Sequence, residues 1–305
     1  MTAATRGVHL SLQLPLPLLS VSLTRSPPSI RSSRKNQFLH STSITDTCSF
    51  KLCCTRNEES SQNMSFKDFS ILKTDLECDI GSTWSTMAFY IFSLHIPLSF
   101  GGLSVVAQLL QQTALDPNTQ VFSLLLIQTL ELVLFLSLLK FSDNRFNILS
   151  SFKTRLLPEK RNWLLASVLG VGFLLALVFL TSLIADKLVG PKDVNNPILK
   201  EILSGGSLSV TGSTLVYCLV TPFLEETVYR GFLLTCLAST MKWEQAVVVS
   251  SIVFSASHLS VDSFLQLFVI GVVLGCSYCW SGTLVSPFVI HSLYNALILV
   301  ITLTS

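Results

Sequence analysis

Seven long apolar runs, separated by polar loops, dominate the chain after residue 86. A helix of about 20 residues crosses a hydrocarbon core about 30 Å thick, and the runs reach or approach that length. None of them alternates polar and apolar positions, and in lipid only helices or closed barrels satisfy the backbone. The pattern therefore predicts an all-α, polytopic transmembrane bundle of about six to eight helices. The candidate runs are 87–110, 121–139, 163–185, 208–241, 245–257, 263–280 and 283–304.

Two of these runs differ in length from the roughly 20 residues of a single membrane-spanning helix. The run 245–257 is short, and we expect it to extend into its flanks. The run 208–241 is long and contains Pro222. A proline inside a helix removes an N–H group and clashes with the preceding turn. The run is therefore read either as two segments or as one tilted helix interrupted at Pro222, with Thr221 as a cap for the second half.

The first part of the chain has a different pattern, without long apolar runs that could span a membrane. No acidic residue precedes Asp46, Ser and Thr are frequent, and Arg residues are scattered through the segment. This composition is typical of an organelle transit peptide. Four prolines break the amphipathic helix that a mitochondrial presequence needs, which favours the plastid; a secretory signal with residues 10–23 as its apolar core is the alternative. We expect a disordered transit peptide over 1–55, a polar linker over 56–86 and the N-terminal transmembrane helices over 87–207.

Composition and charge exclude several classes of protein. Of the 305 residues, 50% are hydrophobic and 12% are charged, whereas a soluble domain has about 25% charged residues. The net charge is only +2, so the chain has no basic excess for nucleic acid. The 8 Cys are too few and too irregularly spaced for a disulfide framework. The CxxC pair Cys276 and Cys279 lies in an apolar run and is interpreted as helix packing.

Charges in the loops predict the orientation in the membrane. The loop 140–162 has six basic residues against two acidic ones, so it should remain on the side from which the protein inserts. In a plastid that side is the stroma. Two crossings separate this loop from the mature N-terminus, which should lie on the same side. The charge-balanced loop 186–207 suits the opposite side.

Charged residues are rare in the last third of the chain, and half of them lie close together. Between residues 206 and 305 only six residues are charged, and Glu225, Glu226 and Arg230 fall within six consecutive positions. An ionisable group at bilayer depth costs about 2.5 to 3.5 kcal/mol, so such groups are retained when they pair or line a working cavity. Helical spacing predicts an ion pair between Glu226 and Arg230 and leaves Glu225 on another face.

Histidines in the apolar regions have two kinds of context. Phe254 with His258, and His291 with Asn295, are pairs at i and i+4, which share one helical face. His95 has no such partner, and we expect it to be a packing residue. Glu131, alone in its run, is interpreted as a polar tie to another helix.

Three motifs in the last third carry a resemblance to a known family. EExxxR occurs in FLEETVYRGFLL, FxxxH in FSASH and HxxxN in HSLYN. In this order and spacing they resemble the motifs of the CPBP family, the CaaX protease and bacteriocin-processing intramembrane proteases, also described as type II CaaX prenyl endopeptidase-like proteins. The resemblance covers about 208–305, which we expect to be the catalytic helical core. The motif residues are Glu225, Glu226, Arg230, Phe254, His258, His291 and Asn295.

The resemblance implies a mechanism for peptide hydrolysis. Glu225 would be the general base, and His258 would help to position the same water. His291 and Asn295 would donate hydrogen bonds to the oxyanion, and either imidazole could protonate the leaving amine. The supporting residues would be Glu226, Arg230 and Phe254.

Metal use is the open point of this mechanism. Members of the family are described both as metalloproteases and as metal-free glutamate-dependent proteases. Glu225, His258 and His291 could supply the three protein ligands of a catalytic zinc, but the HExxH pair is absent. We expect a metal-free enzyme with no cofactor, and zinc is the alternative.

Two functions fit these features. The first is an intramembrane endopeptidase in a chloroplast membrane, either thylakoid or inner envelope, that cuts a membrane protein or peptide. The second is a non-catalytic scaffold or chaperone that retains the fold and stabilises a plastid membrane protein. A transporter fits poorly because the helices show no internal repeat. The expected partners are the lipid bilayer and the membrane-bound substrate, and not nucleic acid.

Overall fold

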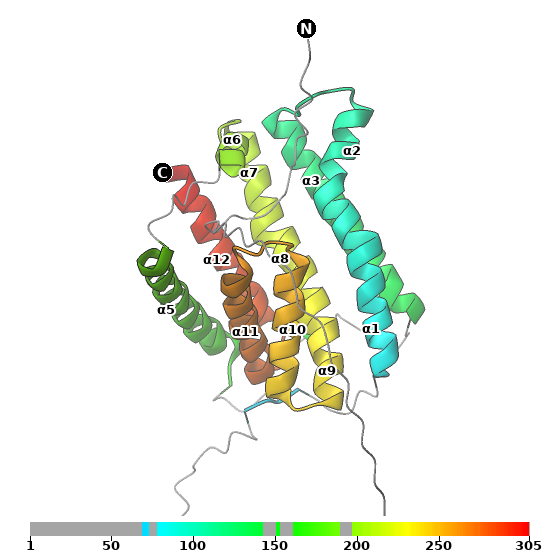
Figure 1. Cartoon of the computed structure of the whole chain (residues 1–305), viewed down its shortest axis with the longest axis vertical. Helices are drawn as coiled ribbons and strands as arrows, with labels where there is room; N and C mark the ends of the chain where they lie inside the picture. The colour runs from blue at the N-terminus through cyan, green and yellow to red at the C-terminus, as the bar shows by residue number, and fades with distance from the viewer. Residues whose placement is uncertain (1–68, 73–77, 143–150, 153–160, 190–196, 305) are drawn as a thin grey trace, which may run out of the picture.

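The described part of the chain is a bundle of helices. The computed structural model describes residues 69–72, 78–142, 151–152, 161–189 and 197–304 (Figure 1). Within these residues all regular elements are helical, which confirms the all-α prediction. Six helices are long and apolar enough to cross a membrane, within the predicted range. They are Ile80–Leu109, Pro117–Phe141, Trp163–Ile184, Ser207–Thr240, Phe264–Ser281 and Val285–Thr304. The predicted transit peptide, 1–55, lies outside the described residues.

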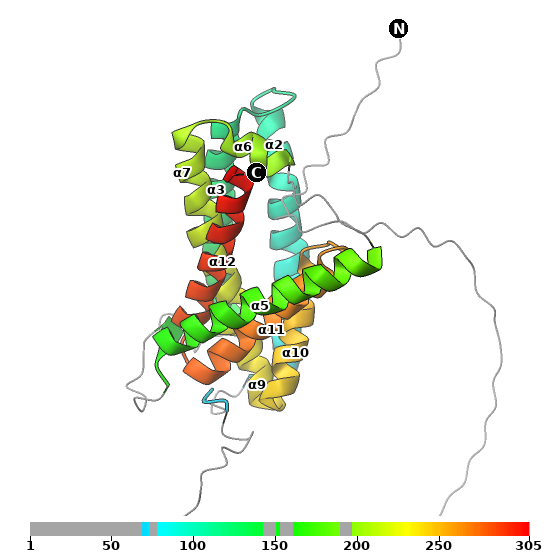
Figure 2. The same cartoon turned by 90° about the vertical axis from the view of Figure 1, so that its left-hand side faces the viewer.

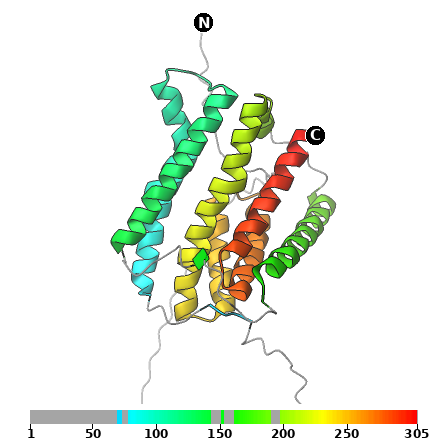
Figure 3. The same cartoon turned by 180° about the vertical axis from the view of Figure 1, so that it is seen from behind.

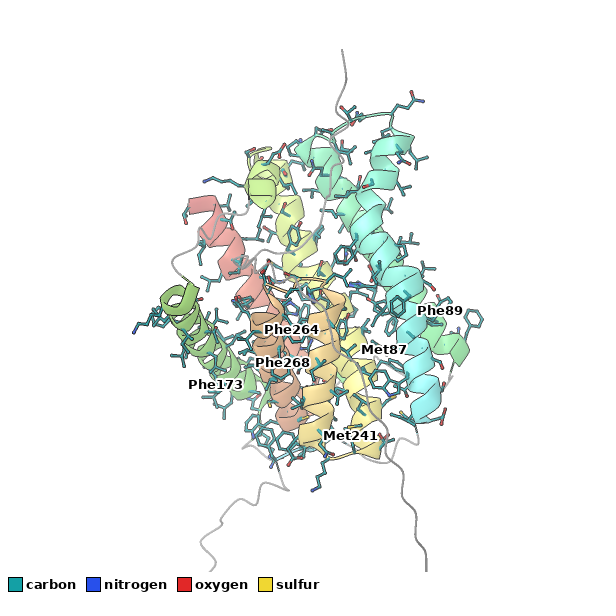
Figure 4. All side chains as sticks on the ribbon, viewed as in Figure 1. Met87, Phe89, Phe173, Met241, Phe264 and Phe268 are labelled. Atoms are coloured by element: carbon teal, nitrogen blue, oxygen red, sulfur yellow. The ribbon has the colours of Figure 1, made fainter. Side chains whose placement is uncertain are left out.

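The outer surface of the bundle is apolar, as a lipid-facing surface should be. Met87 of the first span points into the bundle and is 1% exposed, whereas Phe89 points outward and is 52% exposed (Figure 4). Phe173 of the third span is also on the outside, with 60% of its surface exposed. Because such large aromatic side chains avoid water, their exposure supports a location in lipid.

The first span begins earlier than the apolar pattern indicates. It starts at Ile80 rather than at residue 87, because the Asp79 side chain accepts a hydrogen bond from the Ser82 N–H and caps the helix. This span combines α-helical and π-helical turns: α1 (Ile80–Phe89), η2 (Tyr90–His95), η3 (Pro97–Gly101) and α2 (Gly102–Leu109).

Three further helices precede the motif region. They are α3 (Pro117–Ser142), α5 (Trp163–Val189) and the short α6 (Pro197–Leu203). Asp116 caps α3: the hydroxyl and backbone N–H of Thr119 donate to its carboxylate and lower the pKa of that group. Helix α5 packs on α11 and α12 and crosses them obliquely (Figure 2).

The run with Pro222 forms one continuous helix, so the expected interruption is absent. Thr221 has helical dihedral angles (φ −62°, ψ −50°), and no side-chain capping bond is found at the start of the second half. A π-helical turn precedes the proline, and in it the Thr221 N–H donates to the Val216 carbonyl. This wider turn accommodates a residue that cannot donate. The helix consists of α7 (Ser207–Leu215), η4 (Val216–Val220), α8 (Thr221–Glu225), η5 (Glu226–Leu234) and α9 (Thr235–Thr240).

The last three helices complete the core. They are α10 (Trp243–Ser257), α11 (Phe264–Ser281) and α12 (Val285–Thr304). With 15 residues, α10 is about 22 Å long and shorter than the bilayer core, and its turn into α11 lies part-way along the bundle (Figure 1). Helices α10 and α11 approach closely at Gly271, where an added Cβ would lie 3.1 Å from the Ser251 Cα.

The ends of the helices alternate between the two ends of the bundle. The start of α1, the end of α3 and the end of α9 lie at one end, and α6 and the C-terminus lie at the other (Figure 1). Seen from behind, α3, the 207–240 helix and α12 run side by side (Figure 3). This alternation agrees with two crossings between the start of α1 and the end of α3.

Candidate active site

The four predicted catalytic side chains line one cavity inside the bundle. The cavity has a volume of about 90 Å³, and its wall includes Glu225, His258, His291 and Asn295. They come from three separate parts of the chain: the end of α8, the residue after α10, and one face of α12. The sequence placed them in separate runs, and packing of these helices brings them together.

Glu225 lies between two imidazole rings. Its Oε1 is 3.8 Å from the His258 Nε2, and its Oε2 is 3.7 Å from the His291 Nε2. The Glu225 residue is 8% exposed. These separations exceed the usual length of a direct hydrogen bond, about 2.7 to 3.2 Å. A water could contact the carboxylate and an imidazole together, since such a bridge is enthalpically close to a direct bond.

The second nitrogen of each ring is held by the protein. The His258 Nδ1 donates to the Phe254 carbonyl at 2.7 Å, one helical turn earlier. The His291 Nδ1 donates to the Glu226 Oε1 at 2.8 Å. Both rings therefore present their Nε2 atoms toward Glu225, and the bonds at Nδ1 determine which nitrogen faces the carboxylate.

Glu226 and Arg230 form the predicted ion pair. The Arg230 Nη1 lies 3.0 Å from the Glu226 Oε1, and both side chains are almost fully buried. The Arg230 Nη2 also donates to the Gly271 carbonyl at 3.2 Å, and the guanidinium lies 4.5 Å from the centre of the Phe254 ring. The pair thus joins the 207–240 helix, called the motif helix below, to α10 and α11. Through Glu226 it also fixes the position of the His291 ring.

Asn295 has a structural partner that the sequence did not indicate. Its Nδ2 donates to the Tyr217 carbonyl at 2.8 Å. In the π-helical turn that contains Tyr217, each N–H reaches the carbonyl five residues earlier, as Thr221 does with Val216. The residue five positions after Tyr217 is Pro222, which has no N–H. Asn295 therefore supplies the donor that Pro222 lacks.

A second polar cluster, which the sequence motifs do not include, lies beside the cavity. The Glu131 carboxylate accepts from the Tyr90 hydroxyl at 2.7 Å, the His95 Nδ1 at 2.8 Å and the Ser99 hydroxyl at 3.0 Å. The expected role of Glu131 as a tie between helices is confirmed, because it joins α3 to the first span. His95, Ser99 and Gln128 line the cavity with Glu225, so the N-terminal helices supply part of its wall.

The spacing of these residues in the sequence indicates this cluster only weakly. Tyr90 lies on the same side of the first span as His95 and Ser99 because that segment is π-helical, with more residues per turn than an α-helix. An α-helical spacing rule groups His95 with Ser99 but places Tyr90 on a different face.

Comparison with known proteins agrees with this arrangement. A family model described as "Type II CAAX prenyl endopeptidase Rce1-like" matches residues 207–297. The match begins at the first residue of α7 and includes all three motifs. This segment is therefore similar to the type II CAAX prenyl endopeptidases, in agreement with the resemblance that its three motifs carry. No curated protein and no solved structure matches the chain. The Rce1-like family is a family of proteases, and here its segment lies in a multi-pass bundle of apolar helices.

The Rce1-like segment meets only some of the requirements of a catalytic zinc site. Glu225, His258 and His291 have suitable donor atoms, and both rings are held at Nδ1 as metal-bound histidines are. Their spacing fits less well: in the described ranges, no three or more His, Cys, Asp or Glu side chains are grouped closely enough to hold a metal ion.

Proposed function

We propose that the protein is an intramembrane endopeptidase in which Glu225 activates a water for attack on a peptide bond. The observation that carries the proposal is the position of the Glu225 carboxylate, which lies 3.7 to 3.8 Å from two imidazole Nε2 atoms at the wall of the cavity. A carboxylate that lacks a close charged partner can take a proton from water, whereas the paired Glu226 cannot do so without losing its ion pair.

The proposed reaction uses the groups around this carboxylate. Glu225 takes a proton from the water while the His258 Nε2 orients it, and the oxygen attacks the scissile carbonyl carbon. The His291 Nε2 faces the same space, and because the ring proton is on Nδ1, this atom would donate to the oxyanion after it accepts the proton that Glu225 took from the water. One N–H of the Asn295 amide is used by Tyr217, and a carboxamide has a second N–H that would donate to the oxyanion. The proton held by Glu225 then passes to the leaving amine, directly or through an imidazole.

The substrate would be a membrane protein or a membrane-bound peptide. A cavity of about 90 Å³ has room for a water and a short part of a chain, so the substrate must enter as an extended segment. The segment 1–55 would direct the protein to a chloroplast membrane, because it combines Arg and Ser with an absence of acids up to Asp46. Prenylated CaaX proteins are processed at the endoplasmic reticulum, so a plastid enzyme would cut another client.

A comparison of membrane proteomes tests the activity even while the substrate is unidentified. Cells that carry Glu225→Gln should accumulate an uncut precursor that cells with the wild type process. The matched control is Glu244→Gln, the same chemical change at the start of α10 and away from the cavity, which should leave processing intact. Processing that continues normally in Glu225→Gln cells would contradict the proposal.

The scaffold function predicts a different result in the same experiment. If the protein stabilises a client without cutting it, the client is lost when the whole protein is absent and restored by Glu225→Gln. Zinc is a separate outcome: one zinc per purified chain, with activity lost to a chelator and restored by zinc, would favour a metalloprotease. A reporter fused to residues 1–55 tests the location, and its appearance in mitochondria or the endoplasmic reticulum would overturn the plastid assignment.

A further inference from the structure

Two cysteine side chains meet at the end of the bundle where α1 begins. Cys78 lies just before Ile80, and Cys236 lies in α9, 158 positions later in the chain. Their Sγ atoms are 2.6 Å apart. A disulfide bond is about 2.05 Å long, and two sulfur atoms that share no bond remain much farther apart than this pair. We propose that Cys78 and Cys236 are a modification site at which the protein forms an internal disulfide bond.

The surroundings allow the bond to form without rearrangement of the helices. Cys236 is 1% exposed and belongs to the main hydrophobic core, and Cys78 is half-buried against the same core. Helix α1 packs on α9, so the backbone that carries each thiol is already held in place. Helix α1 begins and α9 ends at the end of the bundle that also contains Met241 (Figure 4). This position makes the pair reachable from the aqueous phase at one face of the membrane.

The reaction is a thiol–disulfide exchange, and its partner is a disulfide-bearing oxidant such as glutathione disulfide or a thioredoxin-fold protein. Cys78 is the more exposed thiol, so it loses its proton and attacks one sulfur of the oxidant, which releases the first thiol. Cys236 then loses its proton and attacks the Cys78 sulfur in the mixed disulfide, which releases the second thiol. The two cysteines are oxidised by two electrons, and the oxidant disulfide is reduced to two thiols that take up the two protons.

The disulfide bond would join two elements that line the cavity, the first span and the motif helix, at the end of the bundle where α1 begins. Cys78 precedes the span that carries His95, and Cys236 follows Glu225 in the same continuous helix. His95 and Glu225 line the same cavity. In the oxidised protein the first span is covalently attached to the motif helix, whereas in the reduced protein it is held by non-covalent contacts such as those of the Glu131 cluster. This inference does not depend on the proposed protease activity.

Mass spectrometry of the full chain tests the proposal directly. Purified protein in detergent is treated with glutathione disulfide, free thiols are alkylated, and the digest is searched for a peptide that links Cys78 to Cys236. We expect this linked peptide in the oxidised sample and its loss after reduction. Oxidation should also raise the midpoint of thermal unfolding in the wild type, and Cys78→Ser should remove that rise.

Matched variants separate this pair from the other thiols. Cys276→Ser changes a half-buried cysteine of α11 and should leave the linked peptide and the thermal shift intact. If both Cys78 and Cys236 remain fully alkylated after oxidation, or if either pairs mainly with another cysteine, the proposed bond does not form. A variant that misfolds does not affect the test, because the linked peptide is sought in the wild type.

Discussion

Adjacent carboxylates in the motif have opposite roles in the structure. Glu226 is 0% exposed, and its Oε1 accepts from both Arg230 and His291. Removal of one member of a buried pair strands the other charge and costs about 3 to 5 kcal/mol. We therefore expect Glu226→Ala to lower the thermal unfolding midpoint and the abundance of the protein strongly. Circular dichroism in detergent and quantitative immunoblotting measure the two effects.

Glu225 provides the control for this prediction. It has no short hydrogen bond to the two histidines, so Glu225→Gln keeps its volume and strands no partner. This variant should unfold within about 0.5 kcal/mol of the wild type while precursor processing stops. An equal loss of stability in Glu225→Gln and Glu226→Ala would contradict the division between a reactive and a structural carboxylate.

Substitutions of Asn295 and Pro222 should have non-additive effects on the free energy of unfolding. Asn295→Ala leaves the Tyr217 carbonyl buried without the donor that Pro222 cannot supply, and an unsatisfied buried polar group costs about 1 to 3 kcal/mol. In a Pro222→Ala background an N–H is present at position 222, so the same substitution should cost less. A double-mutant cycle of unfolding free energies measures the difference. Strict additivity would show that Asn295 does not compensate for the proline.

The motif residues could be found from the sequence, but part of their chemistry could not. Helical spacing correctly predicts the pair of Glu226 and Arg230 because both lie on one helix. The bond between His291 and Glu226 joins positions 65 residues apart, and no local pattern encodes it. The bond from Asn295 to Tyr217 depends on a π-helical turn, and side-chain periodicity of 3.6 gives no sign of such a turn.

At the scale of helices, the hydrogen bonds of the Glu131 cluster attach the first span to α3. Glu131 is 0% exposed and accepts from three groups on that span. Glu131→Ala leaves these donors without their carboxylate, so we expect a loss of about 3 to 5 kcal/mol and easier separation of the first span from α3. Protease sensitivity in detergent and the thermal midpoint report this effect.

A neighbouring residue on the same helix is the control for Glu131. Thr129 is exposed, and its hydroxyl donates to the Leu125 carbonyl of its own helix. Thr129→Ala should therefore remain within about 0.5 kcal/mol of the wild type. If Glu131→Ala is equally mild, the cluster does not fasten the first span.

The elements themselves were largely predictable, and the exceptions have physical causes. Long apolar runs identify the spans because the bilayer demands about 20 apolar residues per helix. Helix α10 was harder to interpret because its 15 residues are fewer than a full crossing needs, and it packs closely on α11. Pro222 suggested an interruption because proline usually breaks a helix, whereas here a π-helical turn and Asn295 accommodate it.

At the scale of the whole molecule, two exposed lysines lie at opposite ends of the bundle. Lys242 follows α9, near the end of α3 and the start of α1, and Lys200 lies in α6 near the C-terminus (Figure 1). Helix α3 ends at the Lys242 end, and the sequence that follows it is rich in Lys and Arg. An excess of Lys and Arg marks the side from which a membrane protein inserts. We therefore expect Lys242 to face the insertion side and Lys200 the opposite side.

Labelling in sealed vesicles measures this orientation without any substitution. When the insertion side faces outward, a membrane-impermeant amine reagent should modify Lys242 and spare Lys200, as read by peptide mass spectrometry. Detergent should then expose both lysines to the reagent, which shows that each is chemically reactive. Since a charged side chain costs about 2.5 to 3.5 kcal/mol at the bilayer centre, neither lysine can reach the far side through the lipid. Labelling of both lysines in intact vesicles would place the two ends of the bundle on one side and overturn the membrane-spanning arrangement.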